Sequence, residues 1–222
     1  MTIQEVMIAV DGVGRVSGLW QAPPKARACL VLAHGAGVGM THKAMTAIAD
    51  GLDKRGIAVL RYQFPYMERG SRRPDSPEVA HAAVRAAVAE AGRRAPLLAL
   101  FAGGKSFGGR MTSQAQALAP LTGVRGLVFF GFPLHPSGEP SAARADHLES
   151  VNIPMLFLQG TRDTLADVSF LRPLVAKLGS RATLKLFEDA DHSFHVPAKT
   201  GRKDEDVLAG ILDTAASWMA ST

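Results

Sequence analysis

The stretch Gly104-Lys105-Ser106-Phe107-Gly108-Gly109 contains the pattern G-x-S-x-G. It follows the apolar run Leu97–Ala102, which reads as a strand, and leads into a helical stretch at Phe107–Leu118. A strand, a sharp turn and a helix are the setting in which this pattern exposes a nucleophilic serine. The flanking glycines are needed because side chains there would collide with the neighbouring strand and helix. The stretch therefore predicts an α/β fold with Ser106 as nucleophile.

A phosphate-binding loop is a second interpretation of the same stretch, because Gly104-Lys105-Ser106 matches the end of that motif. The motif also needs a glycine five positions before Gly104, and the residue there is Ala99. No apolar strand ending in aspartate follows to hold magnesium. The phosphate-binding interpretation is therefore rejected.

On either side of this stretch, short apolar runs alternate with longer helical stretches. The expected strands are Glu5–Val10, Arg15–Gln21, Ala28–Ala33, Ala58–Phe64, Leu97–Ala102, Gly126–Phe130, Met155–Gln159 and Thr183–Phe187. The expected helices are His42–Lys54, Pro77–Arg94, Phe107–Leu118, Val168–Leu178 and Glu205–Met219. The first two strands flank a hairpin signal, Asp11-Gly12, whereas the later strands are almost uniformly apolar. We expect one doubly wound α/β domain over residues 1–222, with a mostly parallel sheet of about eight strands whose first strands are antiparallel.

A nucleophilic serine needs a base, and the base needs an acid to orient it. Asp163 lies in the turn after the strand Met155–Gln159, and His192 lies in the segment after the strand Thr183–Phe187. The order serine, aspartate, histidine is the one expected for this type of sheet. We therefore predict Ser106, Asp163 and His192 as the catalytic residues. His195 is an alternative base and Asp167 an alternative acid.

The loop after an early strand should supply a hydrogen-bond donor for the reacting oxyanion. The segment Ala33-His34-Gly35-Ala36-Gly37 follows the strand Ala28–Ala33, and its glycines leave backbone N–H groups accessible. We predict the backbone N–H groups of Ala36 and Phe107 as the oxyanion hole, with Gly37 as the alternative to Ala36. His34 is expected to fix this loop by hydrogen bonding.

These segments together resemble the α/β-hydrolase superfamily over nearly the whole chain. Within it, three motifs resemble a small branch that is related to dienelactone hydrolases and includes the hydrolase-like domain of a subunit of the non-specific-lethal chromatin complex. The motifs are Gly103-Gly104-Lys105-Ser106-Phe107-Gly108-Gly109-Arg110, His34-Gly35-Ala36-Gly37 and Phe64-Pro65-Tyr66. Dienelactone hydrolases usually carry a cysteine nucleophile, and this chain has serine. Many members insert a lid after the strand that corresponds to Gly126–Phe130, where only the short segment Ser137–Asn152 is available.

Two groups of residues are candidates for contacting substrate. Arg69, Arg72 and Arg73 follow the strand Ala58–Phe64; they could hold a carboxylate or phosphate, although Glu68 and Asp75 beside them favour a solvated loop. Apolar side chains that either line an acyl pocket or pack in the core are Phe132, Leu134, Tyr66 and Met67. No role is assigned to His135.

Composition and charge indicate which kinds of partner, location and cofactor to expect. The net charge is +5, but the basic residues are scattered and form no run of five or six, so we expect no nucleic-acid partner. No apolar run approaches the ~20 residues that cross a bilayer, so we expect no membrane span. The first ten residues lack the features of a signal peptide, and there is one cysteine, so we expect a cytoplasmic protein. No cluster has metal-ligand spacing, and neither metal nor organic cofactor is expected. The oligomeric state is left open.

The pattern indicates a serine hydrolase that acts on small or medium carboxylic esters through an acyl-enzyme. A thioesterase or a peptidase uses the same residues. The remaining alternative is a non-enzymatic scaffold, because a fold does not by itself imply an activity.

Overall fold

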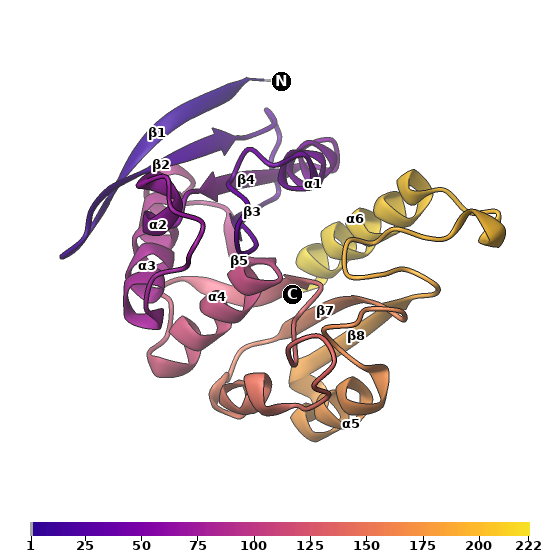
Figure 1. The fold of residues 1–222 in the computed structure, drawn as a ribbon. Helices are drawn as coiled ribbons and strands as arrows, with labels where there is room; N and C mark the ends of the chain where they lie inside the picture. The colour runs from indigo at the N-terminus through magenta and orange to yellow at the C-terminus, as the bar shows by residue number, and fades with distance from the viewer. Residues whose placement is uncertain (1) are drawn as a thin grey trace.

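Eight strands form one sheet in the computed structural model, which describes residues 2–222 (Figure 1). The order across the sheet is β1-β2-β4-β3-β5-β6-β7-β8. Strand β2 is antiparallel to β1 and to β4, and all the other neighbours are parallel. The strands are β1 (Ile3–Val10), β2 (Gly14–Gln21), β3 (Ala28–Ala33), β4 (Ile57–Tyr62), β5 (Ala99–Lys105), β6 (Val124–Phe130), β7 (Met155–Gly160) and β8 (Ala182–Phe187). This confirms the expected mostly parallel sheet with antiparallel first strands.

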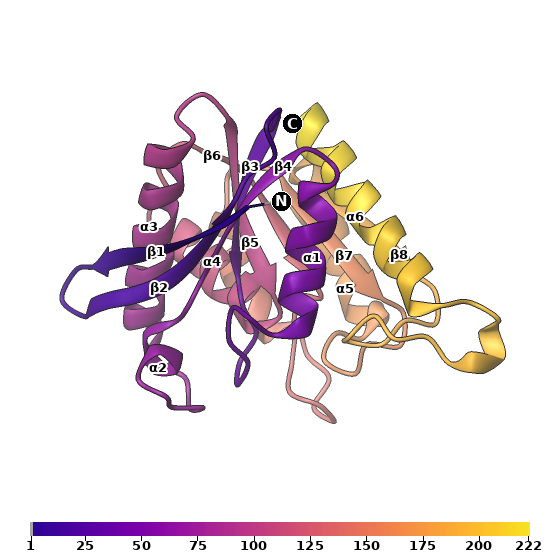
Figure 2. The same ribbon diagram turned by 90° about the horizontal axis from the view of Figure 1, so that it is seen from above.

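Helices cover both faces of the sheet, so the fold has two cores. Apolar residues of α1 and α6 pack on one face, and those of α3, α4 and α5 pack on the other (Figure 2). The helices are α1 (Lys43–Asp53), α2 (Pro65–Glu68), α3 (Pro77–Arg94), α4 (Phe107–Leu118), α5 (Val168–Leu178) and α6 (Asp204–Ser221), with short 3-10 helices η1 (Ala143–Ser150), η2 (Gly179–Arg181) and η3 (Ala198–Thr200). Burial on both sides explains why β3, β4 and β7 are buried at every position.

The largest departure from the sequence expectation is at β5. The strand begins at Ala99 rather than Leu97, whose side chain is 97% exposed, and it continues through both glycines to Lys105. Gly103 and Gly104 remain in the strand because they lie directly against neighbouring backbone. The short helix α2 was not expected. The segment 137–152 holds only a loop and η1, so the fold has no lid.

Candidate active site

Ser106 lies at the junction of β5 and α4 in a strained backbone conformation. Its φ is 52° and its ψ is −118°, in a region that residues other than glycine seldom occupy. A Cβ on Gly104 would lie 2.4 Å from the carbonyl oxygen of Ala33, and a Cβ on Gly108 would lie 2.5 Å from the same atom. Both glycines are therefore required by close backbone approach, as expected, and the turn holds the Ser106 side chain at the carboxyl edge of the sheet.

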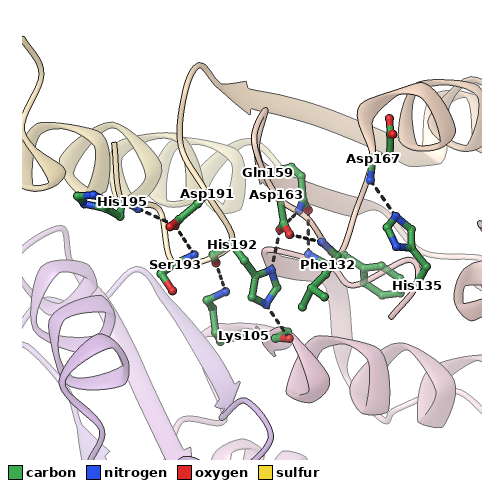
Figure 3. Close-up of polar contacts among 12 residues, drawn as sticks. Lys105, Phe132, His135, Gln159, Asp163, Asp167, Asp191, His192, Ser193 and His195 are labelled. Atoms are coloured by element: carbon green, nitrogen blue, oxygen red, sulfur yellow. Dashed lines mark hydrogen bonds and ion pairs between the residues drawn. The ribbon is translucent and has the colours of Figure 1, made fainter. Parts of the chain in front are cut away.

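The structure brings Ser106, His192 and Asp163 together from three separate loops. Figure 3 shows the His192 ring facing Asp163. His192 Nε2 lies 2.9 Å from Ser106 Oγ, and His192 Nδ1 lies 2.6 Å from Asp163 Oδ2. A carboxylate can only accept, so Nδ1 carries the proton and Nε2 is free to accept the Ser106 hydroxyl proton. This is the geometry of a nucleophile, a base and an orienting acid.

Buried donors fix the orientation of the Asp163 carboxylate. Oδ2 also accepts from the side-chain amide of Gln159, and Oδ1 accepts from the backbone N–H of Leu165 at 2.8 Å. The Gln159 amide is fixed in turn, because its oxygen accepts from the backbone N–H of Phe132 at 2.9 Å (Figure 3). Such a network holds the Asp163 carboxylate oxygens in a fixed orientation facing His192.

His135, which had no role in the sequence analysis, ties two loops of the site together. Its Nε2 accepts from the backbone N–H of Asp167 at 3.1 Å, and its Nδ1 donates to the carbonyl of Pro136 at 2.8 Å. The bond joins the segment after β6 to the segment that carries Asp163 (Figure 3). No local sequence signal marks this clamp, because its two sides are about thirty residues apart.

The alternative base and acid are bonded to other groups, although His195 lines the same pocket as Ser106. His195 is exposed and pairs with Asp204 at 2.8 Å, and this carboxylate raises the pKa of His195. Asp167 caps α5 by accepting from the backbone N–H of Ser169 at 2.8 Å. Neither side chain bonds to Ser106 or His192, so the geometry favours His192 as base and Asp163 as acid.

The predicted oxyanion donors come from two places: Ala36, or its alternative Gly37, lies in the loop after β3, and Phe107 begins α4. The Gly37 N–H already donates to the Tyr66 hydroxyl at 3.3 Å. Within residues 2–222, no acceptor pairs with the N–H of Ala36 or of Phe107, which leaves both available for a ligand oxygen. This difference favours Ala36 over Gly37.

His34 has the loop-fixing contacts expected for it. Its Nδ1 donates to the carbonyl of Gly35 at 2.8 Å, and its Nε2 accepts from the backbone N–H of Phe64 at 3.0 Å. Burial lowers the pKa of His34 to about 4, so the ring is neutral at ordinary pH. It joins the loop after β3 to the loop after β4 as an uncharged clamp.

Lys105, inside the nucleophile motif, contacts the loop of the base. Its ammonium donates to the backbone carbonyl of His192 (Figure 3). It also lies 5.3 Å from the centre of the Phe194 ring. Burial lowers the pKa of Lys105 to about 8, against the opposing effect of Asp163 and Asp191. From the sequence this lysine is recognisable only as part of a motif, because its contact with His192 spans 87 positions.

Two clefts meet at Ser106, and both are also lined by Ala36 and Leu165. The first, of about 790 Å³, includes His192 and Lys105 in its wall and is called the histidine cleft. The second, of about 430 Å³, includes Arg110 and Arg144 and is called the arginine cleft. The site can therefore hold a substrate with one part on each side of Ser106.

Of the two roles left open for the apolar candidates, lining an acyl pocket or packing in the core, the structure shows the second. Phe132, Leu134 and Tyr66 are fully buried in the core, and Met67 packs against that core. The aromatic rings are buried because they fill the space beneath the loops that carry the site, where they contact other rings.

The arginines after β4 do not reach the site either. Arg72 and Arg73 are exposed, and Arg69 pairs with Asp75. None of the three lines the histidine or arginine cleft. This agrees with the solvated-loop interpretation.

Two features are absent from residues 2–222. No group of three or more histidine, cysteine, aspartate or glutamate side chains is arranged to hold a metal ion. None of the helices has the length and apolar character needed to cross a membrane.

Comparison with known proteins agrees with this fold. The family model described as an alpha/beta hydrolase domain matches residues 26–220, and the chain belongs to that family. A serine hydrolase without a lid from Xanthomonas campestris superposes with a TM-score of 0.75 at 21% identity, covering 100% of this chain and 97% of that one. A dienelactone hydrolase from Anabaena variabilis gives 0.77 at 20% identity, with 98% and 97% covered. The esterase domain of a Rhodothermus marinus protein gives 0.75 at 17% identity, with 100% and 99% covered.

Proposed function

We propose that the chain is a serine hydrolase that cleaves carboxylic esters of small molecules, with Ser106 as nucleophile, His192 as base and Asp163 as orienting acid. The observation that carries the proposal is the continuous hydrogen-bonded series from Ser106 Oγ through the His192 ring to Asp163, at 2.9 Å and 2.6 Å. Hydrolase-fold neighbours that include an esterase domain are consistent with it. A cytoplasmic location remains a prediction.

The reaction follows from the positions of these groups. Ser106 Oγ attacks the carbonyl carbon while His192 Nε2 takes the hydroxyl proton, and Asp163 stabilises the imidazolium that forms. The N–H groups of Ala36 and Phe107 hold the oxyanion, and losing one such donor typically costs about 100- to 1000-fold in rate. His192 then gives the proton to the departing alkoxide. In the second half of the reaction, water attacks the acyl carbon while His192 takes a proton from it, and His192 returns that proton to Ser106 Oγ as the acid leaves.

Esters are favoured over amides because an alcohol departs more easily than an amine. A scaffold protein is disfavoured by the strain at Ser106, where an unusual φ costs about 1–3 kcal/mol and persists when surrounding structure enforces it. A protein without catalysis has no evident use for that strain.

The first test is labelling with a fluorophosphonate, followed by intact-mass measurement. One adduct is expected on the wild-type chain and none on Ser106→Ala, because only an activated serine attacks this probe. His192→Ala should also take no label within the time that saturates wild type. Ser193→Ala is the matched control, because Ser193 is an exposed serine in the histidine cleft. It should label as wild type does.

A folded wild-type protein that takes no label would contradict the proposal and make the scaffold interpretation the leading one. Label that persists on Ser106→Ala would place the nucleophile elsewhere. Once labelling succeeds, parallel assays with esters, thioesters and amides of the same acyl group distinguish the esterase from the thioesterase and the peptidase.

A further inference from the structure

The arginine cleft contains two guanidinium groups beside the proposed nucleophile. Arg110 lies one helical turn after Ser106 on α4, and residues four apart on a helix are neighbours on one face. Arg144 comes from η1, which packs against α4. The two are close enough that burial and the charge of Arg144 together lower the pKa of Arg110. Two positive charges therefore face the same small space.

In the described part of the chain, neither guanidinium has a carboxylate as its partner, although that of Arg110 lies 5.9 Å from the centre of the Phe107 ring. Among residues 2–222, no carboxylate forms an ion pair with Arg110 or Arg144, and the buried Nε of Arg110 has no hydrogen-bond acceptor. Asp75 is the acidic residue in the wall of this cleft; its Oδ1 is paired with Arg69, and its Oδ2 is buried without a hydrogen-bond partner among these residues. Placing two like charges together without a counter-charge is unfavourable. An anion bound between them would relieve that cost.

The position of His192 decides which part of a substrate reaches the arginines. The leaving group must lie within reach of His192 Nε2, which protonates it, and His192 lines the histidine cleft but not the arginine cleft. The leaving alcohol therefore extends into the histidine cleft. The acyl group extends from Ser106 to the other side, toward Arg110 and Arg144.

We propose that Arg110 and Arg144 form an anion subsite for the acyl group, so that the preferred substrates are half-esters of short dicarboxylic acids. The proposal rests on the ester hydrolase function proposed above. A guanidinium donates two parallel hydrogen bonds to a carboxylate, which fixes the orientation of the acyl chain as well as its charge. Ser106 forms an ester with the near carboxyl while the alcohol departs with a proton from His192, and water then releases the free dicarboxylate.

The kinetic test compares 4-nitrophenyl hydrogen glutarate with 4-nitrophenyl pentanoate, which have the same leaving group and the same number of acyl carbons. After subtraction of spontaneous hydrolysis, wild type should favour the glutarate half-ester in kcat/KM by about 10- to 100-fold, the range given by hydrogen bonds to charged groups. In Arg144→Gln and in Arg110→Gln this preference should fall toward one. Arg72→Gln is the matched control, since Arg72 is exposed and lines neither cleft. It should keep the wild-type preference.

A binding test separates the subsite from the catalytic function. Methyl hydrogen glutarate is titrated by calorimetry into Ser106→Ala and into Ser106→Ala with Arg144→Gln. Binding that weakens about tenfold or more in the second variant supports the subsite even where wild type takes no fluorophosphonate label, an outcome that removes only the hydrolase proposal.

Two results would overturn the subsite. One is equal kcat/KM for the two esters in an enzyme that labels normally. The other is a preference for the half-ester that stays unchanged in both arginine variants, each checked for folding by circular dichroism. Arg144 lies in a surface segment, so its variant keeps the test valid if the more buried Arg110→Gln does not fold.

Discussion

At the scale of single residues, Lys105 connects the nucleophile motif to the loop of the base. Replacing it with methionine removes the donor to the His192 carbonyl and leaves a partly buried acceptor unpaired, which typically costs about 1–3 kcal/mol. Because the loss displaces His192, we expect kcat/KM of Lys105→Met to fall about tenfold or more, mainly through kcat. Lys43→Met is the control, since Lys43 is an exposed lysine that lines the histidine cleft together with Lys105. Equal activity of both variants would contradict this role.

The same residue predicts a pH dependence of activity. The pKa of Lys105 is lowered to about 8 by burial, so the ammonium is present below pH 8 and lost above it. Its hydrogen bond to the His192 carbonyl becomes weaker when the positive charge is lost. We expect kcat/KM of wild type to decline as the pH rises through about 8, and this decline to be missing from the profile of Lys105→Met. A decline of the same size and midpoint in the variant would assign it to another group.

Two neutral histidines, the buried His34 and the half-buried His147, predict how stability changes in acid. Burial lowers the pKa of both His34 and His147 to about 4, whereas the unfolded chain binds these protons near pH 6.5. Between pH 6.5 and 4 the unfolded state therefore holds more protons, and the stability present above pH 6.5 is lost as the pH falls through this window. Each additional proton bound by the unfolded state lowers the free energy of unfolding by at most about 1.4 kcal/mol per pH unit. Urea unfolding measured at several pH values between 6.5 and 4 gives the free energy of unfolding as a function of pH. This free energy should change less steeply with pH in His147→Gln than in wild type. An equal slope would show that His147 is not held neutral.

At the scale of elements, the contact between α4 and β3 depends on a missing side chain. A Cβ on Gly108 would meet backbone atoms of Ala33 and His34 at 2.5–2.6 Å, and backbone cannot move aside as a flexible side chain can. We expect Gly108→Ala to lower the free energy of unfolding by about 1–3 kcal/mol, as overpacking does. Gly92→Ala, in α3, has no atom nearer than 4.0 Å to the new methyl group. It should raise stability by about 0.5–1 kcal/mol, because alanine loses less backbone freedom in a helix.

Thermal and urea unfolding of the two variants measure this contrast. A rise in stability in both variants would mean that helix propensity, rather than the approach of α4 to β3, governs the junction. If Gly108→Ala moves Ser106, fluorophosphonate labelling should slow in that variant and stay unchanged in Gly92→Ala.

At the scale of the whole molecule, the net charge of +5 adds to the field of the arginine cleft. A positively charged cleft attracts an anionic substrate from a distance, and salt screens that attraction with a Debye length of about 10 Å at 0.1 M and 3 Å at 1 M. We expect kcat/KM for the glutarate half-ester to fall by about three- to tenfold between 0.01 M and 1 M salt. The pentanoate ester should change much less under the same conditions. Parallel curves for the two substrates would show that charge attraction plays no part.

The sequence by itself determined the fold class and the candidate catalytic residues. The parallel strands are buried on both faces and therefore appear in the sequence as short apolar runs. The turn at Ser106 needs glycines close to it in the chain, so a short motif predicts it. The order Ser106, Asp163, His192 indicated the site because parallel strands end at one edge of the sheet. Even here, helix α2 and the continuation of β5 through its glycines were missed, since local propensity favours neither.

Only the tertiary structure decided what surrounds those residues. Three features join segments about thirty or more positions apart in the chain. They are the shared cleft of Arg144 and Arg110, the His135 clamp, and the contact of Lys105 with the His192 carbonyl. The tertiary structure also placed Phe132, Leu134 and Tyr66 in the core rather than in an acyl pocket. The physical reason is that such contacts arise from how irregular loops pack over the sheet edge. Neighbouring residues set the type of an element, whereas side chains brought together by the whole fold set the shape and charge of the site.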